Sequence, residues 1–467
     1  MTFVELDRVA CYRAIQARDA RFDGRFFTAV RTTGIYCRPI CPARCPKLEN
    51  VVFYSSAAAA QAAGFRPCLR CRPECSPELG AWRGTSSTVS RALALISEGA
   101  LDGVGAGVDA LALRLGIGER QLRRLFEQHL GASPIAVAQT RRVLLAKQLI
   151  HETLMRMVDV AFASGFGSLR RFNDTFRKLY GRAPSSLRRE RAGSTARGIT
   201  LTLGYAPPYD WPATLESLAA QAIPGVEAVS AASYRRTIEL DGSHGTLEVA
   251  PLPGKHAVGV AVDFDDLRGL PAIIRRVRNL FDLGSDVAAI GAQLAEDPRL
   301  APLVRERPGL RVLGAWDAFE LAVRAIAGAH VTRLVGALGE SLASGAPREL
   351  STVFPRAERL ARAELGRLGL PRALATTLRE LARAVAADPH ALSADGDLHA
   401  KLTRLGSLPG IDESAAHEVA MRALREPDAF PSRDRSLRAR AERWRPWRAY
   451  AAQHLAEERP AAREAVA

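Results

Sequence analysis

Four cysteines near the N-terminus constrain this chain more than any other feature. Three residues separate Cys37 from Cys41, and after a gap of 26 residues a C-x₂-C pair follows at Cys68 and Cys71. Two close pairs joined by a short loop suit a tetrahedral Cys₄ zinc site. The residues around both pairs are basic: Arg31, Arg38, Arg44, Arg66, Arg70 and Arg72. A zinc-bound thiolate among arginines is either a structural knot beside DNA or a nucleophile directed at something on DNA.

Charge and cysteine usage favour a nucleic-acid partner over a membrane surface. The 467 residues carry a formal net charge of +15, which favours a polyanionic partner. No apolar run approaches 18 residues, and the N-terminus lacks the apolar core of a signal peptide. All seven cysteines precede residue 76, which metal binding in a reducing compartment explains better than disulfides do. We therefore expect a cytoplasmic monomer that spans no membrane, with Cys11, Cys45 and Cys75 as ordinary thiols.

The patterning along the chain predicts several domains. Residues 190–198 are charged and small, as in a linker. Beyond them, turns at Asp241-Gly242 and Pro253-Gly254 separate strand-like stretches, and Ala/Leu/Arg stretches at helical spacing dominate from about residue 267. We expect a multidomain fold with a small α+β zinc domain, an all-α domain, an α+β domain and a second all-α domain, at 1–78, 85–190, 199–308 and 309–456.

The segment 85–190 contains two similar helix-turn-helix units. Apolar positions predicted to face inward are Leu111, Leu115 and Leu122 in the first unit and Val158, Ala161 and Phe162 in the second. The second helix of each unit exposes side chains suited to base edges and phosphates: Arg120, Gln121, Arg123 and Arg124, then Arg170, Arg171, Asn173 and Arg177. One such unit is also typical of a plain amphipathic helix pair. Two units joined by a long helix, at about 134–150, favour DNA binding.

Two family resemblances follow from these motifs. The stretch VDVAFASGFGSLRRFNDTFRKLYGRAPSSLR resembles the signature of AraC-type regulators, which implies that both recognition helices enter successive major-groove segments. RTTGIYCRPIC, ENVVFYSS and GFRPCLRC resemble the N-terminal domain of the Ada methyl-acceptor repair proteins. This second resemblance implies one zinc ion on Cys37, Cys41, Cys68 and Cys71. It also implies that Cys37 attacks the methyl carbon of a DNA methylphosphotriester in a single, suicidal turnover, and that Thr33, Arg44 and Arg66 match contacts to the DNA backbone.

The methyl-acceptor chemistry agrees with the residues. The acceptor must be a thiolate at neutral pH, and zinc coordination keeps it deprotonated. Four thiolates on Zn²⁺ give the site a formal charge of −2, so methylation removes one negative charge and should raise DNA affinity. We expect this change to activate transcription, with RNA polymerase as a candidate partner. A zinc knot without transfer chemistry is the alternative. Because no cysteine follows Cys75, we expect no direct reversal of O6-methylguanine.

The C-terminal half resembles the AlkA-type alkylpurine DNA glycosylases. LGYAPPYDWPATLESLAAQAIPGVEAVSAASYRRTIEL, VLGAWDAFELAVRAIAG and AERWRPWRAYAAQHL carry the resemblance, which spans about 199–456 and implies an α+β cap before a helix-hairpin-helix domain. LGSLPGIDESAA is the hairpin, whose backbone N–H groups around Gly410 would hold a DNA phosphate. Asp434 matches the catalytic Asp, which would stabilise the oxocarbenium-like sugar as the flipped base leaves. The plain alternative is a surface Asp paired with Arg433, Arg435 or Arg438.

The sequence departs from this family where the alkylated base should stack. The usual hairpin pattern is P-G-I-G-x-W-T-A, and Ser414 replaces its tryptophan. Further usual aromatic positions hold Glu418, Ala456, Ser217 and Arg435. His330 could act as the wedge that fills the space left by the flipped base. Lyase-active relatives carry a lysine where Ser414 stands, so we expect a monofunctional enzyme of the DNA-3-methyladenine glycosylase II type without strand cleavage.

Three hypotheses remain. The first is a DNA alkylation repair and response protein that unites a methyl-accepting transcription activator with a glycosylase for 3-methyladenine-type bases. The second is a methyl-sensing regulator whose glycosylase fold is catalytically lapsed and only binds DNA. The third is a zinc-stabilised AraC-type regulator with no chemistry, which requires Cys37 to be inert. Retained Asp434 favours the first hypothesis, and the missing aromatic side chains favour the second.

Overall fold

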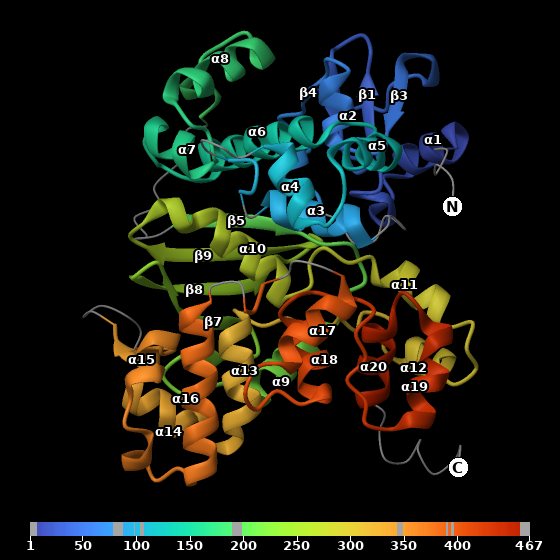
Figure 1. The fold of residues 1–467 in the computed structure, drawn as a ribbon. Coiled ribbons are helices and arrows are strands. Elements are labelled where there is room, and N and C mark those ends of the chain that lie inside the picture. Colours follow the sequence, from blue (N-terminus) through green and yellow to red (C-terminus); the bar gives the residue numbers. More distant parts are fainter. Residues whose placement is uncertain are drawn as a thin grey trace.

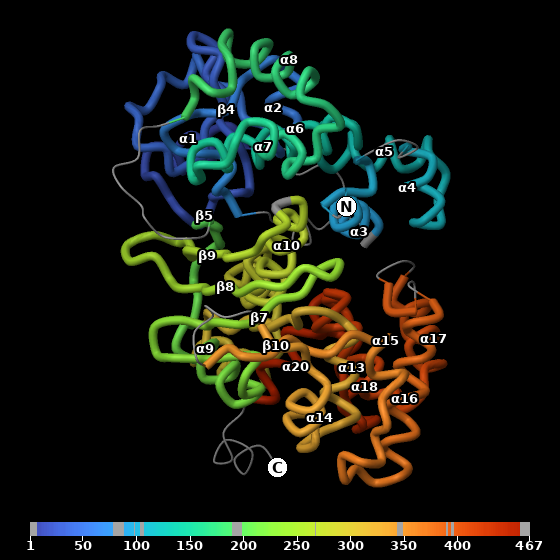
Figure 2. Tube along the Cα trace, turned by 90° about the vertical axis from the view of Figure 1, so that its left-hand side faces the viewer, coloured from blue at the N-terminus to red at the C-terminus, as the bar shows by residue number. Residues whose placement is uncertain are grey.

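The chain is arranged in three layers, with the N-terminal elements above a β-sheet and the C-terminal helices below it (Figure 1). Figure 2, turned by 90°, keeps the same order from the blue to the red end. The computed structural model describes residues 7–77, 87–97, 99–102, 107–188, 199–342, 349–388, 391–393 and 397–457. The predicted linker at 190–198 therefore lies outside the described residues.

The cysteine-rich segment forms a small sheet with strand order β3-β1-β2-β4. Its elements are α1 (Arg8–Ala17), β1 (Phe27–Val30), β2 (Ile35–Cys37), β3 (Val51–Tyr54), α2 (Ala57–Ala62) and β4 (Arg66–Pro67). Strands β2 and β4 run parallel, with Tyr36 opposite Pro67. Cys37 and Cys68 are the next residues along these two strands, so the sheet register brings the two cysteine pairs together.

Six helices form the helix-turn-helix region: α3 (Ser87–Ser97), α4 (Val108–Arg114), α5 (Glu119–Leu130), α6 (Pro134–Glu152), α7 (Met157–Ala163) and α8 (Leu169–Tyr180). The tight turns need glycine, because Gly116 and Gly165 have φ of +70° and +86°. The long helix expected at about 134–150 is α6. Ser133 begins it by accepting a hydrogen bond from the N–H of Ala136.

The inward-facing positions are correct for the first unit and partly wrong for the second. Leu111, Leu115 and Leu122 are buried. In α7, Ala161 and the unpredicted Val160 are buried and Val158 is partly buried, whereas Phe162 is 50% exposed. Side chains two positions apart in an α-helix point in directions that differ by about 200° around the helix axis. Phe162 therefore points away from the side on which Val160 packs.

A five-stranded antiparallel sheet of order β5-β9-β8-β7-β6 forms the middle layer. Its elements are β5 (Ile199–Gly204), α9 (Trp211–Ala220), β6 (Glu227–Val229), β7 (Tyr234–Leu240), β8 (Ser243–Pro251), β9 (Ala257–Phe264) and α10 (Leu270–Leu280). Asp241 and Gly242 both have positive φ in the two-residue turn from β7 to β8, as a type I′ turn requires. The second predicted turn, Pro253-Gly254, connects β8 to β9.

The C-terminal layer is mainly helical. Its helices are α11 (Val287–Leu294), α12 (Leu300–Glu306), α13 (Ala318–Ala327), α14 (Val331–Leu338), α15 (Ala357–Arg362), α16 (Arg372–Ala387), α17 (Leu398–Gly406), α18 (Glu413–Arg422), α19 (Arg435–Ala441) and α20 (Arg448–Ala456). A short ladder pairs β10 (Glu340–Ser341) with β11 (Thr352–Val353). An ion pair of 2.8 Å between Arg236 of β7 and Glu320 of α13, both nearly inaccessible to solvent, joins this layer to the sheet.

One helical run exceeds the apolar length expected from the sequence. The continuous run Ala318–Leu338 has 21 residues and a mean hydropathy of 1.3, which is enough to cross a membrane by length and composition alone. The sequence expectation that no apolar run approaches 18 residues is therefore wrong for this segment. Buried Glu320 lies within the run and is ion-paired with Arg236 and Arg324. We therefore assign the run to the packed helical layer.

Candidate metal centre and nucleic-acid interfaces

The two cysteine pairs meet as one potential metal centre. The Sγ atoms of Cys37, Cys41, Cys68 and Cys71 all lie within 4.8 Å of one another. A tetrahedral zinc with Zn–S bonds of about 2.3 Å separates its sulfurs by about 3.8 Å, so the four thiolates fit one Zn²⁺. The backbone N–H of Arg38 donates to Cys71 Sγ at 3.3 Å. Such a bond favours a thiolate acceptor over a thiol. The expected ligand set therefore forms one centre that fits one zinc ion.

Exposure divides the four cysteines into two pairs. Cys68 and Cys71 are buried, whereas Cys37 and Cys41 are partly accessible. A reactant can therefore approach only one side of the cluster. The three other cysteines lie outside the cluster: Cys11 and Cys75 are buried, and Cys45 is exposed. Burial raises the pKa of Cys75 to about 12, which keeps it a neutral thiol at physiological pH.

The arginines near the cysteines have two different roles. The Arg38 Nε donates to Asp23 Oδ1 at 2.9 Å. Arg72 lies 3.1 Å from Glu74 and 2.6 Å from Glu152, both buried. Arg38 and Arg72 are therefore neutralised inside the protein and add no free positive charge to the surface. The accessible positive charge near the cysteines comes from the exposed side chains of Arg31, Arg44 and Arg70.

The three predicted DNA-backbone contacts do not share one environment. Thr33 is exposed in the turn between β1 and β2, and Arg44 is exposed in the loop after Cys41. Arg66 is half-buried, and its guanidinium lies 5.9 Å from the ring centroid of Tyr180 in α8. Thr33 and Arg44 are thus accessible to a ligand. Arg66 instead contacts the second helix-turn-helix unit.

The predicted recognition helices present basic surfaces. The exposed positions are Arg120, Gln121, Arg123 and Arg124 on α5 and Arg170, Arg171 and Arg177 on α8. Asn173 is partly buried. Arg123 donates to Glu119 one turn earlier in the same helix, at 2.8 Å. Seven of the eight predicted side chains are therefore accessible to solvent. Both helices carry the arginines expected of a surface that contacts a polyanion.

Asp434 is exposed and is the N-cap of α19. Its Oδ1 accepts hydrogen bonds from the N–H groups of Ser436 and Leu437, at 2.8 and 3.2 Å, and from the Ser436 hydroxyl at 2.8 Å. These bonds, that of the hydroxyl first, lower the pKa of Asp434, so it is ionised at neutral pH. Two of the arginines considered as its partners pair elsewhere. Arg433 pairs with Asp412, and Arg438 with Glu413.

The predicted hairpin connects α17 to α18 and requires its glycine. Gly410 has a φ of +78°, and a Cβ atom there would lie 2.3 Å from Thr377 Cγ2. Asp412 caps α18 by accepting from the N–H of Ala415 at 2.8 Å. His330 is partly buried at the start of α14.

Helix α18 holds the segment that carries Asp434 at three places, which the sequence reasoning missed. The ion pair of Asp412 with Arg433 measures 2.6 Å, and Glu413 pairs with Arg438 on the other side of Asp434. The His417 Nδ1 accepts from the N–H of Phe430 at 3.1 Å. The acidic residues at the hairpin and the arginines around Asp434 were the features of the sequence that could have indicated these ion pairs.

The aromatic residues that flank Asp434 in the sequence belong to the protein core. Phe430 and Trp444 are each 3% exposed. Their ring centroids lie 5.9 Å apart in an edge-to-face contact. They therefore offer no open face on which a flipped base could stack. Ser414 and Glu418, which stand at usual aromatic positions, are partly exposed on α18.

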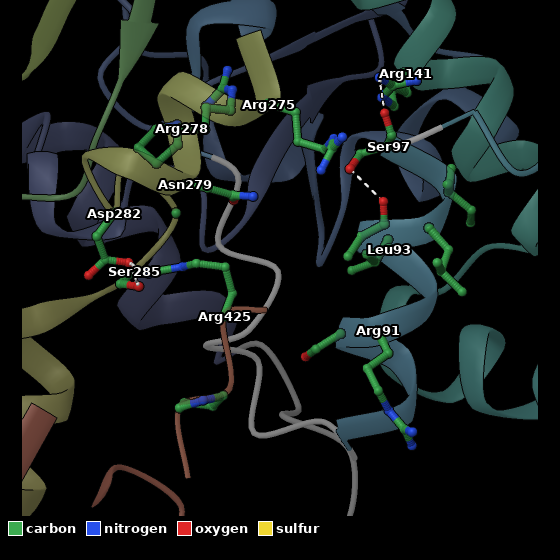
Figure 3. Close-up of a pocket in the computed structure, with 18 of the residues that line it drawn as sticks. Arg91, Leu93, Ser97, Arg141, Arg275, Arg278, Asn279, Asp282, Ser285 and Arg425 are labelled. Carbon is green, nitrogen blue, oxygen red and sulfur yellow. Dashed lines mark hydrogen bonds and ion pairs between the residues drawn. The ribbon is translucent and has the colours of Figure 1, made fainter. Parts of the chain in front are cut away.

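A large cavity lies between the upper layer and the C-terminal helices. It measures about 730 Å³ and is lined by α3, α10 and the segment after α18, among other residues. Figure 3 shows the arginines that line it: Arg91, Arg141, Arg275, Arg278 and Arg425. Arg425 is ion-paired with buried Asp282. Asp434 is not among the lining residues, so this cavity is separate from the hairpin.

These parts define a multidomain protein with zinc-binding, helix-turn-helix and glycosylase-like regions. Three family descriptions match the chain: the metal binding domain of Ada over 10–74, a helix-turn-helix domain over 111–190 and the AlkA N-terminal domain over 200–317. A Mycobacterium tuberculosis protein described as a probable bifunctional transcriptional activator/DNA repair enzyme AlkA is 41% identical, and the match covers 95% of each chain. The chain therefore belongs to this family of bifunctional transcriptional activator/DNA repair enzymes.

Two Escherichia coli proteins each resemble a different part of the chain. DNA-3-methyladenine glycosylase 2 is 31% identical over 54% of this chain and 95% of its own length. The bifunctional transcriptional activator/DNA repair enzyme Ada is 40% identical over 28% of this chain and 35% of its own length.

Proposed function

We propose that this protein repairs DNA alkylation damage and activates the response to it. Cys37 accepts a methyl group from DNA methylphosphotriesters, and the C-terminal half hydrolyses the N-glycosidic bond of alkylated bases of the 3-methyladenine type. The observation that carries the proposal is the convergence of four cysteine sulfurs within 4.8 Å, with Cys37 on the accessible side. The 41% identity to the mycobacterial bifunctional protein supports the union of both activities in one chain.

We assign four domains to these activities. Residues 1–78 form an α+β zinc methyl-acceptor domain, and 85–190 form an all-α double helix-turn-helix domain. Residues 199–308 form an α+β cap, and 309–456 form an all-α helix-hairpin-helix glycosylase domain. The strands and helices of each segment support these classes.

Methyl transfer at Cys37 is a single displacement. The Cys37 Sγ attacks the methyl carbon, an S–C bond forms, and the C–O bond of the phosphotriester breaks. The bonding pair leaves with the phosphate oxygen, so the DNA regains an ordinary phosphodiester anion. A zinc ion held by Cys37, Cys41, Cys68 and Cys71 would keep this sulfur deprotonated at neutral pH. Thr33, Arg44 and, beside Tyr180, Arg66 position the DNA backbone. The product is a thioether, so each protein molecule reacts once.

Loss of one negative charge converts the repair event into a signal. An unmethylated cluster with a formal charge of −2 repels phosphate, and the methylated cluster repels it less. DNA affinity therefore rises. Side chains on α5 and α8 then contact promoter DNA: Arg120, Gln121, Arg123, Arg124, Arg170, Arg171, Asn173 and Arg177. The activator acts as a cytoplasmic monomer, with RNA polymerase as its further partner.

The C-terminal half acts through Asp434 and the hairpin. The Asp434 carboxylate stabilises the cationic sugar as the alkylated base departs. Backbone N–H groups around Gly410 hold a phosphate, and His330 fills the space left by the flipped base. No lysine stands at Ser414, so the enzyme is monofunctional, without lyase activity. The scarcity of exposed aromatic side chains favours a second candidate, in which this half is catalytically lapsed and only grips DNA.

Peptide mapping by mass spectrometry tests methyl transfer. We expect the zinc-loaded protein, incubated with methylated duplex DNA, to gain one methyl group on Cys37. The Cys45→Ser variant should react like the wild type, because Cys45 lies outside the cluster. If no methyl group reaches Cys37 while zinc remains bound, the acceptor proposal is wrong and the cluster is a structural knot.

A further inference from the structure

Helix α6 is tied to the zinc region by a buried polar network. The side chain of Lys147 is fully inaccessible to solvent and is ion-paired with buried Glu74. Its Nζ also donates to the backbone carbonyl of Cys68 at 2.9 Å. Arg72 lies 3.1 Å from Glu74 and 2.6 Å from Glu152, which stands at the end of α6. A ligand residue of the metal centre is thus connected through buried charges to the helix that joins the two recognition units.

The same helix is bonded to the edge of the glycosylase-half sheet. Strand β5 is the edge strand of that sheet. The backbone N–H of Thr202 donates to Glu152 Oε2 at 3.1 Å, and Gln148 Nε2 donates to the Thr202 carbonyl at 2.9 Å. Two side chains of α6 therefore form hydrogen bonds with backbone groups that have no partner strand at the edge of the sheet. In Figure 1, α6 lies above the sheet on the side of β5.

Apolar packing continues across this contact. One uninterrupted core cluster contains Leu149 of α6, Phe172 and Phe176 of α8, and Leu201 and Leu203 of β5, all fully buried. The second helix-turn-helix unit and the sheet therefore share a core. The backbone also approaches closely, because a Cβ atom at Gly204 would lie 2.1 Å from the Cys75 carbonyl oxygen.

The first helix-turn-helix unit is placed differently. Helices α3, α4 and α5 have a separate core cluster, which includes Leu95, Leu111 and Phe126. The cavity of about 730 Å³ lies between α3 and α10, as Figure 3 shows. The glycosylase half is therefore joined to the zinc region and to the second unit, but meets the first unit across a cavity.

We propose that the glycosylase half has a second role, as the scaffold that holds the zinc centre and the recognition helix α8 in a fixed relation. This role needs β5 and the contacts of Glu152 and Gln148 with Thr202, and it does not need base excision. It applies equally to an active and to a lapsed glycosylase. The damage-sensing part of the chain then depends on strand β5, which belongs to the glycosylase half.

Hydrogen exchange on the full chain tests the scaffold directly. In the Glu152→Gln variant we expect amide exchange to rise about tenfold in 199–204 and in 66–75, equivalent to about 1.4 kcal/mol. Gln148→Leu, which removes the other bond to Thr202, should accelerate exchange in 199–204. The matched control is Glu127→Gln, a change at an exposed position of α5. If Glu152→Gln and Gln148→Leu both accelerate exchange only within α6, the scaffold role is refuted.

A second measurement tests the consequence for repair and rests on the proposed methyl transfer. Uptake from methylated duplex DNA requires the zinc centre and α8 to engage one DNA together, whereas methyl iodide requires only the Cys37 thiolate. We expect Glu152→Gln to slow uptake from duplex about tenfold and to leave alkylation by methyl iodide unchanged. Equal uptake from duplex by Glu152→Gln and wild type would contradict the inference. If wild type takes no methyl from duplex, the proposed function fails, and hydrogen exchange still decides the scaffold role.

Discussion

At the scale of single residues, exposure decides which cysteine sulfur can react. Cys37 and Cys41 lie on the accessible side of the cluster, and Cys68 and Cys71 lie on the buried side. Cys37 is the last residue of β2, and its partial exposure leaves its sulfur open to a reactant from solvent. The geometry thus restricts the reaction to one side of a site whose four ligands are chemically alike.

Thiol labelling with and without zinc tests this arrangement. In the zinc-loaded protein we expect iodoacetamide to label Cys45, which is exposed and lies outside the cluster. Removing the metal with a chelator should release Cys37 and Cys41 for labelling. Cys75 should remain unlabelled in the folded protein at neutral pH, because burial raises the pKa of its thiol to about 12. Fast labelling of Cys75 before Cys45 would contradict the assignment.

The buried pair of Glu320 and Arg236 predicts a pH dependence of stability. Burial alone would raise the pKa of Glu320, but Arg236 and Arg324 lower it to about 2. Because the folded-state pKa lies below the ordinary value near 4.5, Glu320 contributes stability above about pH 4.5 that is lost as the pH falls toward 2. The full contribution corresponds to roughly 3 kcal/mol.

Urea unfolding of wild type and Glu320→Gln, followed by tryptophan fluorescence, measures this contribution. Trp316 is a suitable reporter because the Arg236 guanidinium lies 4.8 Å from its ring centroid. We expect the wild type to be the more stable protein at pH 7, and the difference to shrink as the pH falls from about 4.5 to 2. A difference that stays constant over this range would show that Glu320 is not held ionised by its arginines.

The sequence predicted the four zinc-site cysteines but not the orientation of the arginines beside them. Spacing indicated two close pairs that fit one tetrahedral ion, and the resemblance to the Ada methyl-acceptor domain implied which cysteines form them, because Cys45 and Cys75 stand at similar spacing. Arg38 and Arg72 looked equally available for DNA. Their partners Asp23 and Glu152 lie 15 and 80 positions away in the chain, so only the fold shows that both side chains point inward.

At the scale of elements, the hairpin between α17 and α18 carries the proposed phosphate contact, and its acidic residues hold the segment that carries Asp434. The sequence located this hairpin, because it is a local pattern of a few residues. It did not show that Asp412 and Glu413 pair with Arg433 and Arg438. Those pairs span 21 and 25 positions and require α18 and α19 to be placed side by side.

Substitution of the hairpin glycine tests the role of this element. Gly410→Ala should lower stability and weaken duplex DNA binding, because its φ is +78° and the added Cβ would meet Thr377. We expect the substitution to lower the free energy of unfolding by about 1 to 3 kcal/mol. Thermal unfolding and fluorescence anisotropy with labelled duplex measure both effects.

Gly406→Ala is the matched control for this experiment. Gly406 ends α17, and an added Cβ there would meet no atom within 4 Å. Alanine favours a helix over glycine by about 1 kcal/mol, so this variant should be as stable as the wild type or more stable. If Gly410→Ala behaves like Gly406→Ala, the hairpin does not impose the constraint assigned to it.

At the scale of the whole molecule, the two halves form a joined structure. The sequence divided the chain correctly into zinc-binding, helix-turn-helix and glycosylase-like regions, because each region carries its own motifs. It treated them as separated by linkers. The contacts of Lys147 with Glu74, and of Glu152 with Thr202, connect positions 73 and 50 apart and follow no local pattern. The prediction that Phe162 faces inward was wrong for a related reason. The residue at which α7 begins determines which of its side chains face the core, and no local pattern shows it.

The most direct test of the central claim is the release of free bases from methylated duplex DNA by the wild type and by Asp434→Asn. Asp434 keeps a cap in the variant through the amide oxygen of Asn, so the fold of α19 should survive. We predict that wild type releases 3-methyladenine and that Asp434→Asn releases it at least about 100-fold more slowly, as expected for loss of transition-state charge stabilisation. If the wild type releases no base while Cys37 still takes up methyl groups, the claim of a working glycosylase is wrong and the protein is a damage-sensing regulator.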